Sequence, residues 1–365
     1  MANSTLSKAK ADKKDEFYTQ FYDIEAEMEA YLDYNPDVFR GKTVLLPCDD
    51  PEWSNFTKYF AQNFEELGLK KLISTSYAPD SKTYKGGTQL SLFETQSPKF
   101  DKDKTRTHGK IFVLTEDTTG DGVIDLDDLQ WDYLEGDGDF RSDEVKKLRD
   151  EADIIITNPP FSLFRVFLAW IVEAKKQFII IGNINCVTYK EVFPLIQNNQ
   201  MWLGYGFKGG AGHFISQYKD IATAGNHKEG MIRVSGVNWF TNLDIKKRHE
   251  FLVLYKNYSP ELYPTYENFN AINVNRTDDI PCDYDGIMGV PITFMDKYNP
   301  EQFEIVGLGI ANLGLSIGVK PYKPEHKAYR KEVQRRGAVD GDLYIMNGNE
   351  VVVPYARILI RKVKK

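Results

Sequence analysis

Short runs of strand length alternate with segments of helical spacing through the first 200 of the 365 residues. Four runs of four to eight residues, rich in apolar side chains, lie at 43–46, 70–77, 153–158 and 177–183. Between the last two, Leu163, Val166, Phe167 and Trp170 recur at the spacing of one helix face. Strands that alternate with helices in this way predict an α/β fold with a doubly wound, mostly parallel sheet.

The pattern changes after residue 200. Segments 201–206 and 236–243 predict two further strands, and the glycine-containing, mildly basic stretch 208–233 between them predicts a flexible loop. Residues 251–365 are short segments punctuated by Pro and Asn, without helical rhythm until about 325, which indicates a mostly β region. We therefore expect one domain over 1–250, with an irregular insertion at about 95–134, and a second region over 251–365.

The most informative stretch is 153–161, where an acid leads an apolar run that two prolines end abruptly. At the carboxyl end of a strand in an open α/β sheet, where ligands bind, this pattern delivers Asn158 to a site. Pro159 and Pro160 fix the backbone and leave their carbonyls as acceptors, while Phe161 adds an aromatic face. These groups suit an exocyclic amine, because the oxygens accept its hydrogens, its lone pair is left to attack, and the ring stacks on the heterocycle. The alternative is a Pro-Pro turn after an ordinary core strand.

A second set of acceptors follows the strand at 43–46. Asp50 stands before Pro51, a pattern typical of a helix N-cap followed by proline at the first helical position. Asp49 is then expected to be free at the strand end, where it meets a cationic or hydroxyl-bearing ligand. The strand at 70–77 ends without an evident acid that would hold a ribose.

The segment 136–142 places Asp139 and Phe140 next to glycines that allow a tight backbone approach. A carboxylate beside a ring suits the amino group and the ring of an adenine, and the alternative is a simple Gly-Asp turn.

Residues 117–128 resemble the twelve-residue calcium loop of an EF-hand, with Gly122 at the sixth position and Asp128 in place of the usual final Glu. A structural calcium ion and a solvated acidic turn are both consistent with the pattern. The candidate ligands are Asp117, Thr119, Asp121, Val123, Asp125 and Asp128.

Charge and composition limit the remaining choices. The net charge of −7 opposes binding to a polyanion, but residues 201–365 carry 22 Lys and Arg against 18 Asp and Glu, a net charge of +4. Cys48, Cys186 and Cys282 are far apart and predict neither disulfides nor a zinc site. No apolar signal segment or run of eighteen apolar residues is present, so we expect a cytoplasmic protein without membrane contact.

The Asn-Pro-Pro-Phe stretch resembles the amine-methylating motif of S-adenosylmethionine-dependent, amino-group DNA methyltransferases. The order of the other motifs resembles the EcoRI-type adenine-N6 DNA methyltransferase family, and those motifs are KDEFYTQ at 14–20, CDDP at 48–51, SNF at 54–56, GDGDFRS at 136–142, TYKEVF at 188–193 and VPITF at 290–294. Residues of about 95–134 and 308–345 match poorly.

The resemblance implies a class I S-adenosylmethionine-dependent methyltransferase, with a catalytic domain over 1–250 and a target-recognition region over 251–365. It implies that a flipped adenine meets the catalytic residues Asn158, Pro159, Pro160 and Phe161. The implied cofactor-binding residues are Phe17, Tyr18, Thr19, Pro47, Cys48, Asp49, Asp139, Phe140 and Asn158. For Phe17 and Tyr18, ordinary core packing is the alternative.

The resemblance also implies double-stranded DNA as partner, a cognate restriction endonuclease that acts on the same site, and a monomeric bacterial or phage-encoded protein of a restriction-modification or host-defence system. Loop 208–233 would close over the DNA or is merely disordered. Basic residues of the C-terminal region are candidate phosphate contacts or solvated surface, namely Lys323, Lys327, Arg330, Lys331, Arg335, Arg336, Arg357, Arg361, Lys362, Lys364 and Lys365. Two other readings stay open: methylation of amines in RNA or of a protein glutamine, and a non-catalytic DNA-binding relic of the fold.

Overall fold

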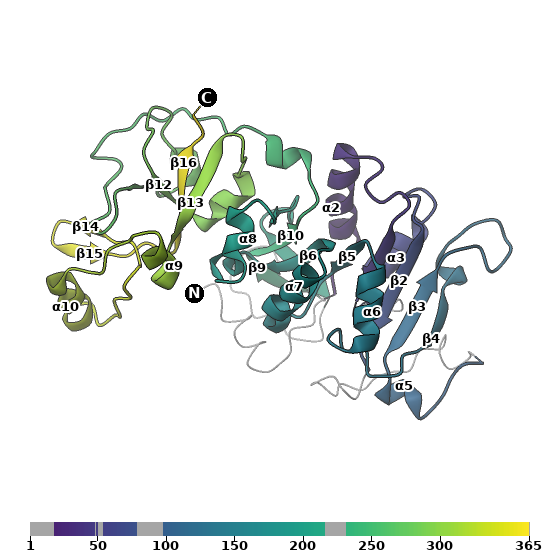
Figure 1. Ribbon diagram of the computed structural model, residues 1–365. Coiled ribbons are helices and arrows are strands. Elements are labelled where there is room, and N and C mark those ends of the chain that lie inside the picture. The colour runs from purple at the N-terminus through teal and green to yellow at the C-terminus, as the bar shows by residue number, and fades with distance from the viewer. Residues whose placement is uncertain (1–17, 48, 50–53, 79–97, 216–230, 365) are drawn as a thin grey trace. The chain divides into compact units, whose positions relative to one another are not determined.

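The computed structural model describes residues 18–47, 49, 54–78, 98–215 and 231–364, and the chain forms two compact units (Figure 1). Unit 1 consists of residues 1–183 and 203–245, and unit 2 of residues 184–202 and 246–365. Residues 184–202 were expected to belong to the first domain, whereas they group with the C-terminal residues.

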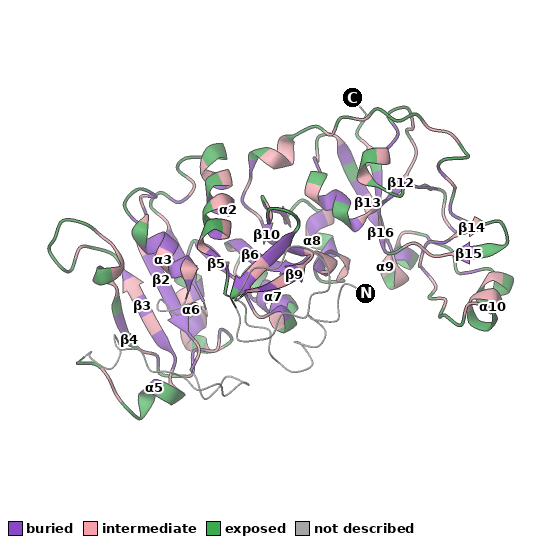
Figure 2. Ribbon diagram, turned by 180° about the vertical axis from the view of Figure 1, so that it is seen from behind, coloured by how far each residue is buried: buried purple, intermediate pink, exposed green. Residues whose placement is uncertain are grey.

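Unit 1 is built round an eight-stranded sheet in the order β4-β3-β2-β1-β5-β6-β10-β7. Its strands are β1 (Thr43–Leu46), β2 (Lys71–Ser76), β3 (Lys110–Leu114), β4 (Gln130–Tyr133), β5 (Ile154–Thr157), β6 (Gln177–Asn183), β7 (Trp202–Leu203) and β10 (Val237–Thr241). β1 is parallel to both β2 and β5, and β5 is parallel to β6. These four strands are almost entirely buried (Figure 2), which is why they read as continuous apolar runs. The predicted doubly wound α/β sheet is therefore confirmed.

Helices cover both faces of this sheet. On one face, α2 (Phe21–Tyr34) and α3 (Asn55–Gln62) share a core with Trp239 of β10. On the other face, Phe164 of α7 (Phe164–Glu173) packs edge-on against Phe240, the next residue of β10, with ring centroids 5.2 Å apart. α6 (Asp143–Glu151) lies beside α7 (Figure 1). Neighbouring strand residues therefore face opposite layers, as a doubly wound sheet requires.

Both edges of the sheet are antiparallel. β10 pairs antiparallel with β6, in keeping with the strand predicted at 236–243. At the other edge, β3 pairs antiparallel with β2, and β4 with β3. This part of the chain was expected to be irregular. β3 alternates buried with half-buried positions and β4 has a single buried residue, so neither gives an apolar run. A short helix, α5 (Lys104–Thr107), precedes β3.

One local expectation needs correction. The stretch 208–233 was predicted as a flexible loop, but its described residues include β8 (Ala211–Ile215) and most of β9 (Met231–Ser235), which pair antiparallel, while 216–230 lie outside the described residues. The helix cap expected at Asp50 and Pro51 falls outside the described residues. The described helix of this region, α3, has Ser54 as its N-cap, and the Ser54 hydroxyl accepts the Phe56 amide at 3.1 Å.

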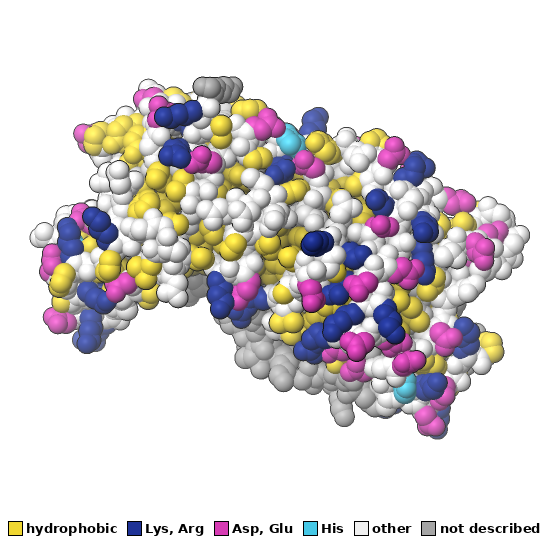
Figure 3. Space-filling view, in the orientation of Figure 1, with side chains coloured by type: hydrophobic (Ala, Val, Ile, Leu, Met, Phe, Trp, Pro, Cys, Tyr) yellow, Lys and Arg dark blue, Asp and Glu magenta, His cyan; other side chains and the backbone are white. Residues whose placement is uncertain are grey.

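Unit 2 holds a four-stranded sheet in the order β11-β12-β16-β13 and the strand pair β14-β15. These strands are β11 (Ile272–Asn273), β12 (Met288–Pro291), β13 (Phe303–Gly309), β14 (Ile345–Asn347), β15 (Glu350–Val352) and β16 (Arg357–Lys362). The helices are α8 (Phe193–Gln197), α9 (Ala311–Ser316) and α10 (Pro324–Glu332), the last of which starts where helical rhythm was expected. Basic and acidic side chains are interspersed over the face shown in Figure 3.

Short 3-10 turns connect these elements at Leu126–Asp128, Phe161–Leu163, Ile184–Thr188, Lys246–His249, Thr277–Asp279 and Ile292–Lys297. Within the described ranges, no helix is both long and apolar enough to span a lipid bilayer.

Candidate functional site

The carboxyl ends of β1 and β5 lie side by side, because Val44 pairs with Ile154 and Leu45 with Ile155. The Asp49 side chain ties the two strand exits together. Its Oδ2 accepts the Thr157 hydroxyl at 2.6 Å, and its Oδ1 accepts the Ser54 hydroxyl at 2.8 Å. Asp49 is only 8% exposed, so the prediction of a free carboxylate is wrong: the side chain holds the loop together.

Buried hydroxyls fix the same turn through its backbone. Thr57 and Ser74 both donate to the Asp49 carbonyl, and their hydroxyl oxygens lie 2.9 Å apart. Thr157 also lies 2.9 Å from the Pro47 carbonyl. This set was not predicted from the sequence, although Ser74 and Thr157 stand at strand positions that an apolar residue would otherwise fill.

Asn158 contacts the segment that precedes α2. Its Nδ2 donates to the Thr19 hydroxyl at 3.3 Å, and the Asn55 side chain donates to the Thr19 carbonyl at 2.7 Å. The neighbouring Tyr18 pairs with Ile215 of β8 through two backbone hydrogen bonds of 3.2 Å. The structure thus brings motifs at 18–20, 54–56 and 157–158 together. Phe17 and Cys48 lie outside the described residues.

The remaining residues of the Asn-Pro-Pro-Phe loop differ in exposure. Pro159 is buried, while Asn158 and Pro160 are half-buried. The Pro160 carbonyl accepts the Leu163 amide at 2.8 Å, whereas in the described part of the chain no donor is bonded to the Pro159 carbonyl. Phe161 is 5% exposed and belongs to the core of unit 1, so any ring stacking on it requires a face of the ring to be uncovered.

Loop 136–142 lies at the carboxyl end of β2, on the same edge of the sheet. Gly138 has φ +83°, and a β-carbon on it would come within 2.3 Å of the Ser76 carbonyl, so only glycine allows this approach. The Ala78 amide donates to the Asp137 carbonyl at 2.7 Å. The strand β2 itself ends without an acid. Loop 136–142, which is distant in sequence, therefore brings Asp137 to this strand end.

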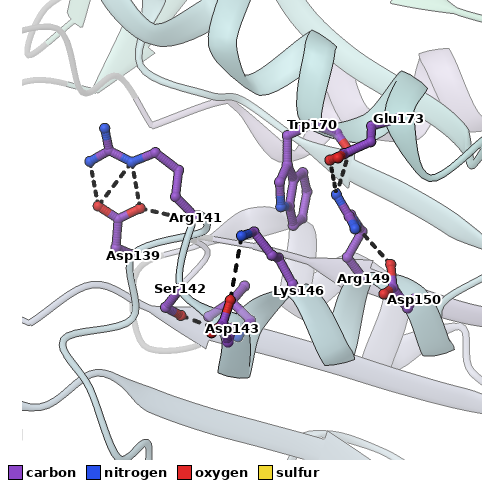
Figure 4. Close-up of polar contacts among 10 residues, drawn as sticks. Asp139, Arg141, Ser142, Asp143, Lys146, Arg149, Asp150, Trp170 and Glu173 are labelled. Atoms are coloured by element: carbon purple, nitrogen blue, oxygen red, sulfur yellow. Dashed lines mark hydrogen bonds and ion pairs between the residues drawn. The ribbon is translucent and has the colours of Figure 1, made fainter.

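Asp139 is engaged by a side chain two positions away (Figure 4). Arg141 binds its carboxylate through two guanidinium nitrogens, with Nη2 at 2.5 Å from Oδ2 and Nε at 2.9 Å from Oδ1. These hydrogen bonds lower the pKa of Asp139 below its ordinary value, so the carboxylate stays charged at neutral pH.

Phe140 lies in the core, 4% exposed, with its ring centroid 5.0 Å from that of Phe167 and 5.6 Å from that of Trp170. Arg149 of α6 fixes this packing, since its guanidinium donates to the Trp170 carbonyl at 2.9 Å and to Glu173 at 3.0 Å (Figure 4). The ring therefore has a structural role whatever else it contacts.

The acidic loop 117–128 is closed by its own backbone. Asp117 accepts the amides of Gly120 at 2.6 Å and Gly122 at 2.8 Å. Asp128, 1% exposed, accepts the amides of Thr118, Thr119 and Asp125 at 2.7, 2.9 and 3.1 Å. Across the ranges given above, no group of three acidic, His or Cys side chains converges as metal ligands would, and the calcium ion stays a prediction.

The order of the central strands, with an antiparallel strand inserted beyond β6 and a polar loop at the end of β5, defines the class: a class I methyltransferase, which takes its methyl group from S-adenosylmethionine. Within that class, the chain belongs to the family described as "Adenine-specific methyltransferase EcoRI", whose model matches residues 5–363.

Three curated relatives support this assignment. The Type II methyltransferase M.EcoRI of Escherichia coli is 43% identical over 330 residues, which cover 88% of this chain and 94% of the relative. M.MpnI of Mycoplasma pneumoniae is 33% identical, covering 82% of this chain and 84% of the relative. M.MgeORF184P of Mycoplasma genitalium is also 33% identical, covering 82% and 85%. No solved structure gave a significant match.

Proposed function

We propose that this chain transfers a methyl group from S-adenosylmethionine to the exocyclic N6 of an adenine flipped out of double-stranded DNA. The observation that carries the proposal is the position of Asn158, at the tip of β5 and bonded to Thr19. Support for DNA as substrate comes from the family, which is adenine-specific, and from relatives named as Type II methyltransferases.

In this proposal, Asn158 Oδ1 and the Pro159 carbonyl accept the two hydrogens of the amine. Because the Asn158 Nδ2 donates to Thr19, the amide is oriented with its oxygen as the acceptor for substrate. Accepting both hydrogens turns the nitrogen lone pair toward the electrophile, and Phe161 stacks on the base once its ring is uncovered.

The bound donor supplies a methyl group on a positively charged sulfur. The carbon–sulfur bond would break as the nitrogen–carbon bond forms, and its electron pair would leave with the sulfur as a neutral thioether. No strong base is required before transfer, since placement in line supplies most of the rate, and the surplus amine proton leaves to solvent. Of the residues that would hold the donor, Tyr18, Thr19, Pro47, Asp49, Asp139, Phe140 and Asn158 lie at or beside the carboxyl ends of β1, β2 and β5, and Asp49 contributes through its backbone. Phe17 and Cys48 complete the proposed set.

Asp137 joins this set as a candidate for the ribose hydroxyls, because the Ala78 amide fixes its backbone at the end of β2. Burial, followed by the nearby Asp137 and Asp139 carboxylates, raises the pKa of Tyr77 beside it, so this strand end is rich in acceptors.

We further propose a cytoplasmic monomer that works with a cognate restriction endonuclease on the same site, in a restriction-modification or host-defence system. Residues 251–365 would form its target-recognition region. The direct test is to sequence modified bases in DNA from cells that express the protein. We expect N6-methyladenine at one short recurring sequence, whereas DNA without methylated adenine would overturn the assignment.

The alternatives separate in other assays. Incorporation of label from the methyl donor into RNA or protein, but not into duplex DNA, would indicate another amine substrate. Failure to bind the donor in calorimetry would indicate a relic of the fold.

A further inference from the structure

The basic side chains of unit 2 fall into two kinds. One kind is bound within the unit: Lys323 to Glu267 at 2.7 Å, Lys327 to Asp340 at 2.9 Å, and Arg361 to Glu304. Arg330 likewise donates to the Gln334 side chain at 2.8 Å and to the Gly337 carbonyl at 3.1 Å. The charges of these residues are already used to hold unit 2 together.

The second kind is exposed and unpaired. Lys331, Arg335 and Arg336 are exposed, and over residues 18–364, apart from the gaps named above, no carboxylate forms an ion pair with any of them. They end a stretch, 320–336, that carries seven Lys and Arg against two Asp and Glu. Figure 3 shows basic side chains interspersed with acidic ones over this part of unit 2. We call Lys331, Arg335 and Arg336, which lie at and just beyond the end of α10, the α10-end surface.

The backbone holds the α10-end surface rigidly. The Gln334 amide donates to the Tyr329 carbonyl at 3.2 Å, and the Arg336 amide to the Arg330 carbonyl at 3.0 Å. The Gln334 side chain also donates to the Val351 carbonyl of β15 at 2.9 Å. Cations on a helix end and on the hydrogen-bonded turn after it lose less conformational freedom on binding an anion than cations on a flexible tail would.

Arg335 occupies a backbone position that favours glycine. Its φ of +52° lies in the left-handed region, where a side chain costs about 1 kcal/mol relative to glycine. A glycine at this position would relieve that cost.

We propose that the α10-end surface contacts the sugar–phosphate backbone of duplex DNA and positions unit 2 on it without reading bases. This inference rests on the proposed function. The competing explanation is that cations near the end of a helix offset its dipole, which would stabilise the helix by about 0.3–1 kcal/mol and leave DNA binding unchanged.

The test compares two triple variants that remove the same charge. One is K331Q/R335G/R336Q, and the matched control is K323Q/K327Q/R361Q, which removes three paired cations. The probe is a labelled duplex of random sequence, titrated between roughly 50 and 200 mM salt. Each lost phosphate contact lowers the magnitude of the slope of log affinity against log salt by about 0.9. We therefore expect the first triple variant to lower this magnitude by about 3 and to bind the duplex roughly 100-fold more weakly. The control should change the slope by less than 1.

If both triple variants lose the same affinity and salt slope, the effect is one of general electrostatics. If the first triple variant loses neither, only the helix-end role remains. Either result overturns the inference. Arg335→Gly alone guards against misfolding, since it relieves strain at φ +52° and should leave thermal unfolding unchanged or improved while lowering the slope by about 1. If the unaltered protein methylates adenine in duplex DNA but the triples do not differ, the inference alone fails. If the unaltered protein neither binds nor methylates duplex DNA, the proposed function fails with it.

Discussion

Two regions of unit 1 are rich in acceptor side chains, and their hydrogen bonds differ in reach. At the ends of β1 and β5, Thr157 bonds to Asp49 across 108 positions, and Asn158 bonds to Thr19 across 139. In loop 117–128, the longest bond, from Thr118 to Asp128, spans ten positions. The two buried carboxylates thus have different structural roles. Asp49 connects segments that are distant in sequence, and Asp128 stabilises a local turn.

The largest effect should come from Asn158→Ala. This change removes the amide that orients the amine, so we expect kcat for methylation of duplex DNA to fall by roughly a thousandfold or more. Binding of the donor, measured by calorimetry, should weaken but persist, because the other residues that hold the donor remain, and thermal unfolding should stay close to that of the unaltered protein. Full activity in this variant would remove Asn158 from the catalytic site.

Asp49→Ala and Asp128→Ala form a matched pair, since each deletes a buried carboxylate. Asp49→Ala leaves the hydroxyls of Ser54 and Thr157 without an acceptor, which should cost roughly 3 kcal/mol in urea unfolding and reduce kcat about 10- to 100-fold. Asp128→Ala should destabilise the acidic loop and leave kcat unchanged. Equal loss of kcat in both variants would erase the distinction between the two regions.

Thr19→Val removes the acceptor of the Asn158 amide while keeping the shape of the side chain. We expect kcat to fall roughly 5- to 30-fold, corresponding to about 1–2 kcal/mol, with little change in KM for the donor. Thr19→Ser restores the hydroxyl and should recover most of the activity. A purely structural role for Thr19 would instead lower thermal stability in both variants in parallel with activity.

The smallest effect concerns pH. Burial tends to raise the pKa of Asp128, but hydrogen bonds from the amides of Asp125, Thr119 and Thr118 outweigh it and lower the pKa to about 2. A lowered pKa gives stability that is present above the unfolded value of about 3.9 and is lost as the pH falls toward 2. Urea unfolding between pH 2 and 5 should show this component, and Asp128→Asn should remove it. Calcium that binds the loop should raise the unfolding temperature, and no rise at millimolar calcium would reject the ion.

The sequence predicted the central strands and the loop at Asn158, because both are encoded by adjacent residues. It did not predict β3, whose alternating burial gives no apolar run, nor the partner of Asp49, which lies 108 positions away. The pairing of Asp139 with Arg141 spans only two positions and could have been anticipated. Among the basic residues of unit 2, the folded chain separates paired from unpaired cations, a distinction that depends on which acids approach them in space.

The central claim is that the amide at the tip of β5 directs a methyl group to adenine N6 in duplex DNA. The measurement that tests it most directly is nucleoside analysis of duplex DNA after incubation with labelled donor and either the unaltered protein or Asn158→Ala. We predict labelled N6-methyladenine with the unaltered protein and none with the variant. Label in another nucleoside, or equal labelling by both proteins, would contradict the account.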